Sequence, residues 1–171
     1  GKKLNIIDCP GSDDFVGAAL TALNVTDTAM LLINGLFGPE VGTQNHFRYT
    51  EKLHKPVIFL VNQLDAEGCD YDAVVEDLQS IYGQKVVPVQ YPTETGENFN
   101  ALIDVILMKK LTWSAEGGEP TIEDIPAEEK DKAEAMHKAL VEAAAENDEG
   151  LMEKFFDTEH LTEDEMREGI R

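Results

Sequence analysis

The sequence has few cysteines and no long apolar run, and each absence narrows the class of protein. Cys9 and Cys69 are the only cysteines in 171 residues, and they lack C-x-x-C spacing. Neither a disulfide framework nor a zinc site is therefore indicated. No apolar stretch approaches the roughly 20 residues of a membrane span, and no basic-then-apolar signal peptide opens the chain. We expect a soluble, cytoplasmic protein with two free thiols and no membrane partner.

Basic residues are also scarce, because 14 Lys and Arg stand against 34 Asp and Glu, for a net charge of -20. Residues 115–171 alone hold 19 acids and 6 bases, which leaves a charge of -13. This charge repels nucleic-acid backbone on average, so an encounter with RNA needs a local site or a basic protein partner. On composition alone, the C-terminal third is interpreted as a solvated helical surface.

Short apolar runs alternate with helical stretches from residue 4 to residue 90. The apolar runs lie at 4–7, 29–33, 57–61 and 86–89, and the helical stretches at 14–23, 43–54 and 71–81. This alternation predicts an α/β fold, a mostly parallel sheet with helices on both faces. The run 57–61 has no polar alternation, so we expect a central strand covered on both faces.

The pattern changes after Tyr91. Periodicity does not assign residues 102–108 to strand or helix, and residues 114–120 are predicted to be a loop. Pro126 stands at the first turn of a long predicted helix. Its apolar stripe consists of Ala133, Met136, Leu140, Val141 and Ala144. A short helical segment at 151–156 follows, and Thr162 to Glu165 has the spacing of a capping box. The character of residues 91–171 thus differs from that of residues 4–90.

A carboxylate and a Pro-Gly turn follow the first apolar run, in the order Asp8, Cys9, Pro10, Gly11. Ligands of open parallel sheets bind beyond the carboxyl ends of the strands. A carboxylate there can hold a water of a bound Mg²⁺, and the backbone N–H of Gly11 can approach a terminal phosphate. D-x-P-G alone is a weak signal, because Pro-Gly turns after strands are common.

A second polar turn, Asn62, Gln63, Leu64 and Asp65, follows the run 57–61. The Asp65 carboxylate can accept from both N1–H and the exocyclic amine of guanine, which adenine does not offer. Asn62 can tie the loop to phosphate-binding backbone. Each bond to a charged acceptor contributes about 1.5–3 kcal/mol. Turn-forming Asn and Asp would also explain N-x-x-D, but both motifs together favour a guanine nucleotide site.

These motifs resemble those of a known family, the translational GTPases of the elongation factor G type. "NIIDCPGSDDF" stands where that family has N-I-I-D-T-P-G-H-x-D-F, and "NQLD" where it has N-K-x-D. Residues 125–166 are similar to the acidic helical insert in the nucleotide-binding domain of that family. "DFVGAAL" and "GPEVGT" look closer to its divergent paralogues. The resemblance covers residues 4–171.

The resemblance implies a factor that binds GTP and Mg²⁺ and drives translocation of tRNA and mRNA on the ribosome. Residues 1–90 would be part of the GTP-binding domain, and residues 91–171 its acidic α+β insert subdomain. The acidic insert would face the ribosomal stalk protein, which gives its charge a role beside that of a solvated surface. Ribosomal RNA would lie near the nucleotide site. We expect a monomer.

Two departures from the family concern nucleotide binding. The sequence has no G-x-x-x-x-G-K-[ST], so the phosphate loop and first switch are missing from these residues. The chain also stops before the last guanine-contacting loop of the family. We therefore expect an internal part of a longer protein, inactive by itself. Gln63 replaces a Lys whose stem packs along the base, which weakens the pocket without changing its selectivity.

The third departure concerns hydrolysis. Ser12 replaces the His that positions the attacking water, and it is too short to reach the same point. Asp13 is a weak candidate to stand in, since its negative charge lies beside a phosphate. Water-orienting and proton-transfer groups contribute roughly a hundred- to ten-thousand-fold. We therefore expect a GTP-binding switch with weakened hydrolysis.

Three functions remain open on the sequence. The first is a translation GTPase with residual activity. The second is a ribosome-bound factor that uses GTP as a structural ligand without hydrolysis. The third is an acidic interaction module that binds no nucleotide.

Overall fold

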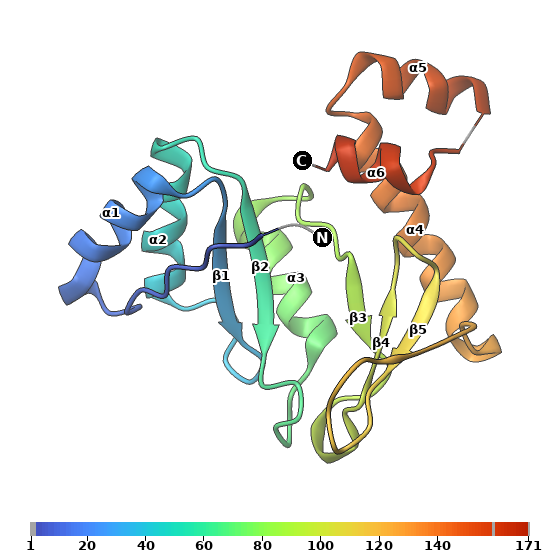
Figure 1. Cartoon of the computed structure of the whole chain (residues 1–171), viewed down its shortest axis with the longest axis horizontal. Coiled ribbons are helices and arrows are strands. Elements are labelled where there is room, and N and C mark those ends of the chain that lie inside the picture. Colours follow the sequence, from blue (N-terminus) through green and yellow to red (C-terminus); the bar gives the residue numbers. More distant parts are fainter. Residues whose placement is uncertain (1–2, 159, 171) are drawn as a thin grey trace. The chain divides into compact units, whose positions relative to one another are not determined.

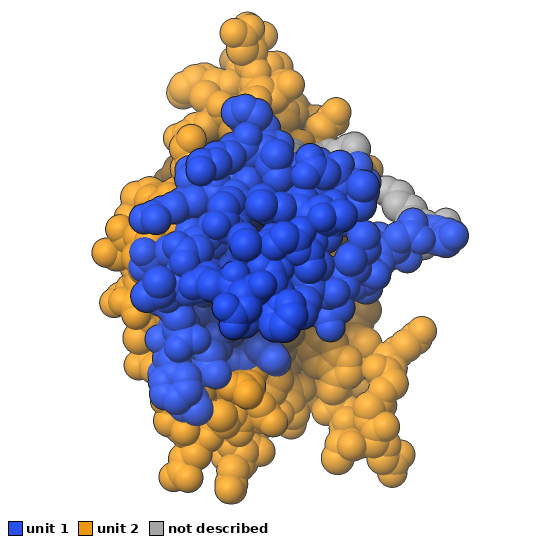
Figure 2. Space-filling model, turned by 90° about the vertical axis from the view of Figure 1, so that its left-hand side faces the viewer, with its two compact units in different colours: residues 1–62 blue, residues 63–171 orange. Residues whose placement is uncertain are grey.

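The computed structural model describes residues 3–158 and 160–170, and the chain divides into two compact units. The first unit is Gly1–Asn62 and the second is Gln63–Arg171, coloured blue and orange in Figure 2. Each unit has its own sheet (Figure 1). The boundary predicted between residues 90 and 91 is a different division and stays a prediction. No helix in the described ranges has the length and apolar character to cross a membrane.

The first unit is a β–α–β crossover preceded by a helix (Figure 1). Its elements are η1 (Asp13–Phe15), α1 (Val16–Val25), β1 (Ala29–Asn34), α2 (Val41–Lys52) and β2 (Val57–Asn62). The two strands are parallel, in register from Ala29 opposite Val57 to Asn34 opposite Asn62. The α/β fold class, with a parallel sheet and helices, is therefore confirmed.

Within the described part of the first unit, one face of this two-stranded sheet is covered. Phe59 on β2 stacks on Phe47 of α2, with ring centroids 5.9 Å apart. On the opposite face, Ile58 and Leu60 are exposed, as are their β1 neighbours. Successive side chains of a strand point to opposite faces, so covering one face leaves every second residue in solvent. The prediction of a central β2 covered on both faces is wrong.

The predicted first strand, residues 4–7, is not formed. Leu4 and Ile6 are 83% and 88% exposed, and this segment is extended without a strand partner in the described chain. A strand is stabilised through its ladder to a neighbour, and among the strands of the described residues β1 and β2 form a ladder with each other alone. The expectation of a buried strand leading into Asp8 is therefore wrong for this structure.

The second unit combines a four-stranded antiparallel sheet with helices (Figure 1). Its strands lie in the order β3-β4-β5-β6. Its elements are α3 (Tyr71–Tyr82), β3 (Gln90–Pro92), η2 (Gly96–Asn98), β4 (Ala101–Asp104), β5 (Lys109–Thr112), β6 (Thr121–Glu123), η3 (Ala127–Glu129), α4 (Lys130–Ala145), α5 (Glu149–Thr158) and α6 (Glu163–Gly169).

Residues 86–89 do not form the predicted fourth parallel strand. Pro88 has no backbone N–H to donate to a ladder, and the carbonyl of Val89 accepts from the N–H of Val105 at 3.0 Å. The strand that follows, β3, begins at Gln90 and pairs antiparallel with β4. The parallel sheet of the described residues thus has two strands, and this part of the chain belongs to the antiparallel sheet instead.

The segment that periodicity left open, residues 102–108, is a strand followed by a tight reversal. Asp104 ends β4, and its Oδ1 accepts from the N–H groups of Ile106 at 3.0 Å and Leu107 at 2.9 Å. Met108 then adopts a left-handed φ of 52°, and β5 runs back along β4. The buried Asp104 is what turns an apolar run into a hairpin.

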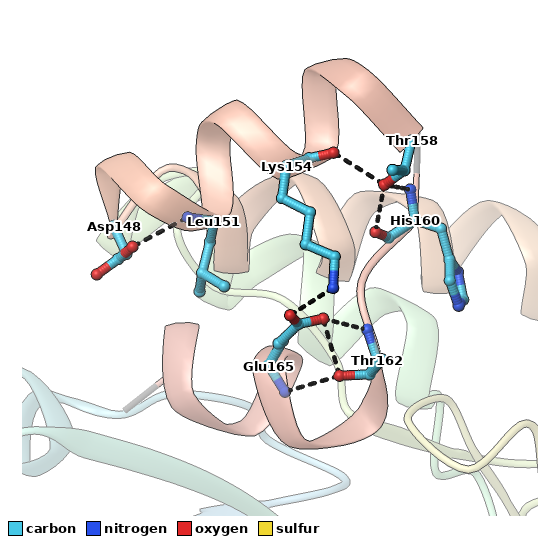
Figure 3. A network of polar contacts seen from close by, with 7 residues as sticks. All are labelled: Asp148, Leu151, Lys154, Thr158, His160, Thr162 and Glu165. Carbon is cyan, nitrogen blue, oxygen red and sulfur yellow. Dashed lines mark hydrogen bonds and ion pairs between the residues drawn. The ribbon is translucent and has the colours of Figure 1, made fainter.

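The helical part of the second unit follows the sequence prediction. The predicted stripe of α4 faces the core: Ala133, Leu140, Val141 and Ala144 are buried, and Met136 packs against the cluster that contains Ala133 and Leu140. The Thr162 capping box is also formed, with the Thr162 hydroxyl accepting from the N–H of Glu165. Figure 3 shows Lys154 of α5 reaching the same Glu165 carboxylate. One acidic side chain thus joins α5 to the start of α6.

Candidate functional site

The D-C-P-G segment lies in the first unit as an exposed extended chain beside two helices. Asp8 is exposed and does not follow a strand, which corrects the predicted placement. The Cys9 thiol lies 3.9 Å from the carbonyl oxygen of Ala18 on α1. A Cβ built on Gly42 of α2 would lie 3.7 Å from the carbonyl oxygen of Gly11. The segment therefore has few contacts and leaves the Asp8 carboxylate open to solvent.

Ser12 and Asp13 differ in how they are held. The Ser12 carbonyl accepts from the N–H of Phe15 at 2.9 Å, while its side chain makes no capping hydrogen bond to η1. The Asp13 carboxylate accepts from the side-chain amide of Asn45 on α2 at 3.3 Å. Asn45 is 32 residues away, so no local pattern in the sequence indicates this contact. Asp13 is therefore drawn toward α2.

Asn62 is the last residue of β2, as predicted for a ligand-facing strand end. It lies opposite Asn34, the last residue of β1, so both parallel strands end at the same level. The carbonyl of Asn62 accepts from the N–H of Gly35 at 2.9 Å, and Asn34 Oδ1 accepts from the N–H of Leu36 at 2.8 Å. Two amide side chains thus mark this carboxyl edge of the sheet.

The rest of the second motif, Gln63 to Asp65, opens the second unit as a tight turn. Gln63 has a φ of 61°, uncommon for a residue other than glycine, and its carbonyl accepts from the N–H of Ala66 at 3.1 Å. Leu64 is buried while Asp65 is exposed. The turn thus anchors one side chain in the core and presents the next carboxylate outward.

The environment of the Cys69 thiol in this loop is buried and close to two carboxylates. Burial raises the pKa of its thiol, and the nearby carboxylates of Asp70 and Asp65 raise that pKa further. The N–H of Cys69 donates to the carbonyl of Ala66 at 3.2 Å, and the residue is buried. Cys69 is a free thiol, as predicted.

Two residues outside the motif hold its backbone, and sequence reasoning missed both. The hydroxyl of Thr95 donates to the carbonyl of Cys69 at 2.8 Å. The N–H of Gly96 donates to the carbonyl of Leu64, also at 2.8 Å. Both donors lie far along the chain from their acceptors, and no motif in the sequence marks them.

The donor chemistry fits the ligands that the motifs predict. Mg²⁺ usually keeps several waters and takes one or two carboxylates together with substrate phosphates, so the single exposed Asp8 suits a water-mediated contact. An exposed carboxylate at Asp65 can accept two donors from one base edge. Within the described ranges, no group of three or more His, Cys, Asp or Glu side chains could hold a metal ion by itself.

The described residues define a class of domain: a parallel β–α–β unit whose second strand ends in an N-x-x-D turn, as in part of a GTPase-type domain. Residues 1–160 match the family of the elongation factor Tu GTP binding domain, and the chain belongs to this family. The resemblance to a translational GTPase domain is thereby confirmed.

A crystal structure of a protein from Thermus thermophilus is similar to the chain, with 33% sequence identity and a TM-score of 0.83. The match covers 95% of this chain and 24% of that protein. The chain therefore spans about a quarter of the length of this relative.

Proposed function

We propose that these residues supply the base-recognition turn and the segment beside the terminal phosphate in a GTP-binding elongation factor of the elongation factor G type. The observation that carries the proposal is the turn after β2, which buries Leu64 and exposes Asp65 in a chain of this family. Asp8 to Gly11 would lie along the phosphates, with Asp8 holding a water of Mg²⁺. Asn62 to Asp65 would hold the guanine base.

Weak hydrolysis is the second part of the proposal. Ser12 occupies the position of the water-orienting His, and a hydroxyl on one carbon cannot span the distance that an imidazole spans. Asp13, the other candidate, is bonded to Asn45 and would place a negative charge beside a phosphate. Neither side chain therefore supplies an efficient water-positioning group, and GTP acts mainly as a switch ligand.

Ser12→His in the full-length protein that carries these residues tests this proposal on ribosomes. Single-turnover GTP cleavage should rise by at least about tenfold, because positioning the water acts on the chemical step. GTP affinity should stay within about twofold, since such a group makes little contact with the ground state. Ser12→Ala is the matched control and should leave the cleavage rate unchanged.

Two outcomes would contradict weak hydrolysis. If Ser12→His does not raise a wild-type rate that is already fast, another group positions the water, and Asp13→Asn would identify it by a loss of rate. If Ser12→Ala slows cleavage, the hydroxyl itself takes part. Absence of GTP binding by the full-length protein would instead favour an acidic interaction module.

The acidic helices supply the partner surface in this proposal. Residues 115–171 carry a charge of -13, and Phe156 on α5 is 75% exposed beside Asp157. A basic surface patch on the ribosomal stalk protein would complement this charge, and ribosomal RNA would approach the nucleotide side. The factor would act as a cytoplasmic monomer in translocation. Binding of purified stalk protein should weaken steeply between low and high salt.

A further inference from the structure

The turn that carries Asp65 is fastened at both ends by two consecutive residues of a distant loop. Gly96 holds the start of the turn through the carbonyl of Leu64, and Thr95 holds its end through the carbonyl of Cys69. Both donor–acceptor distances are 2.8 Å, within the range of well-formed protein hydrogen bonds. All of these residues belong to the second unit.

The geometry of Gly96 is specific to this contact. Its φ of 82° lies in the left-handed region, which favours glycine. A Cβ at this position would lie 4.0 Å from the carbonyl oxygen of Ala66, an ordinary contact. The glycine is therefore required by the backbone conformation that directs its N–H at Leu64, and not by lack of space.

Burial adds a second restraint on the same turn. Leu64 and Cys69 are 9% and 7% exposed, while Asp65 between them is exposed. The side chains of Leu64 and Cys69 are buried and their carbonyls accept hydrogen bonds. These contacts restrain the backbone of the turn that carries Asp65. A carboxylate that must meet two donors of one base edge needs such support, because small displacements weaken both bonds.

We propose that Thr95 is a positioning residue for base recognition: with Gly96 it clamps the 64–69 turn so that the Asp65 carboxylate meets N1–H and the exocyclic amine of guanine together. This inference rests on the proposed guanine-binding role of Asp65. Thr95 itself does not contact the nucleotide.

The test uses the full-length protein that carries these residues and measures its affinity for GDP and IDP, whose base lacks the exocyclic amine. Thr95→Val removes the hydroxyl at nearly constant volume. GDP affinity should fall about three- to tenfold and IDP affinity less, because GDP makes two bonds to Asp65 and IDP one. Thr95→Ser, which keeps the hydroxyl, should restore the wild-type ratio of the two affinities.

Thr93→Val is the matched control in the same loop. The backbone N–H of Thr93 donates to the carbonyl of Ala101 at 3.2 Å, and the substitution keeps this bond. It should leave the GDP to IDP ratio unchanged. Equal losses for both nucleotides in Thr95→Val, or equal effects of Thr93→Val and Thr95→Val, would overturn the proposal. Failure of Thr95→Ser to restore the ratio would do the same.

A measurement on the wild type keeps the test decisive if Thr95→Val does not fold. The amide of Gly96 should exchange with solvent at least about tenfold more slowly than that of an exposed loop residue such as Glu94, and fast exchange would overturn the clamp. Asp65→Asn separates the two proposals. If it leaves base preference unchanged, the proposed function fails; if it shifts preference while Thr95→Val does not, only the clamp fails.

Discussion

Lys154 on α5 and Glu165 in the first turn of α6 form an ion pair with an N–O distance of 2.5 Å (Figure 3). The N–H and the hydroxyl of Thr162 also donate to this carboxylate, each at 2.8 Å. These donors, Lys154 first, lower the pKa of Glu165 to about 2. The ionised form of Glu165 is thus part of how α5 and α6 are joined.

Lys154→Met should raise the Glu165 pKa toward its ordinary value of 4.5, and Thr162→Ala should raise it less, since Lys154 is the largest cause. Carboxyl NMR titration measures both. Because the folded pKa is the lower one, the contribution of Glu165 to stability is present above about pH 4.5 and lost as pH falls toward 2. Lys138→Met on exposed α4 surface is the control, and an equal shift there would contradict a direct pair.

Gly169 lies so close to α4 that a side chain has no room. A Cβ there would overlap the carbonyl oxygen of Ala144 and lie 2.8 Å from its carbonyl carbon. These are backbone atoms that cannot rotate away, so Gly169→Ala should destabilise the second unit by about 1–3 kcal/mol. Urea unfolding of the chain measures this loss.

Gly17→Ala is the control for that prediction, because a Cβ on Gly17 in α1 would meet nothing within 4 Å. Gly17 lies in the first turn of α1, where a Gly→Ala change in open space should stabilise by up to about 1 kcal/mol. Unchanged stability in Gly169→Ala would show that α6 shifts away from α4 at little cost.

Asp65→Asn should reverse base preference in the full-length protein. The new amide can donate to the C2 carbonyl of xanthine, whereas it can no longer accept from both donors of guanine. We expect at least about a tenfold loss of GDP affinity with a gain for XDP, measured by calorimetry. Glu67→Gln, an exposed acid in the same loop, should change neither. Equal weakening of both nucleotides would make Asp65 a turn residue only.

Local signals in the sequence determined much of this protein. The helices follow from 3.6-residue periodicity and caps: the Thr162 capping box and the Gly83 end of α3, at a φ of 92°, are local chemistry. The positions of Asn62 and Asp65 after β2 are also indicated by their own motif. Helix caps depend on residues a few positions apart, so local sequence predicts them, whereas the burial of Leu64 and the support of its turn by Thr95 and Gly96 depend on distant residues.

Only the tertiary structure decided which apolar runs become strands. Residues 4–7 and 86–89 have strand-like composition, yet no described strand pairs with the first, and the second contains Pro88 and leads into an antiparallel sheet. The contacts Asn45 to Asp13 and Thr95 to Cys69 join residues 32 and 26 positions apart. A strand forms only when a second strand pairs with it, and a side-chain hydrogen bond forms only when its partner lies nearby in space. In both cases the partner is a residue distant in the sequence, which a local pattern does not identify.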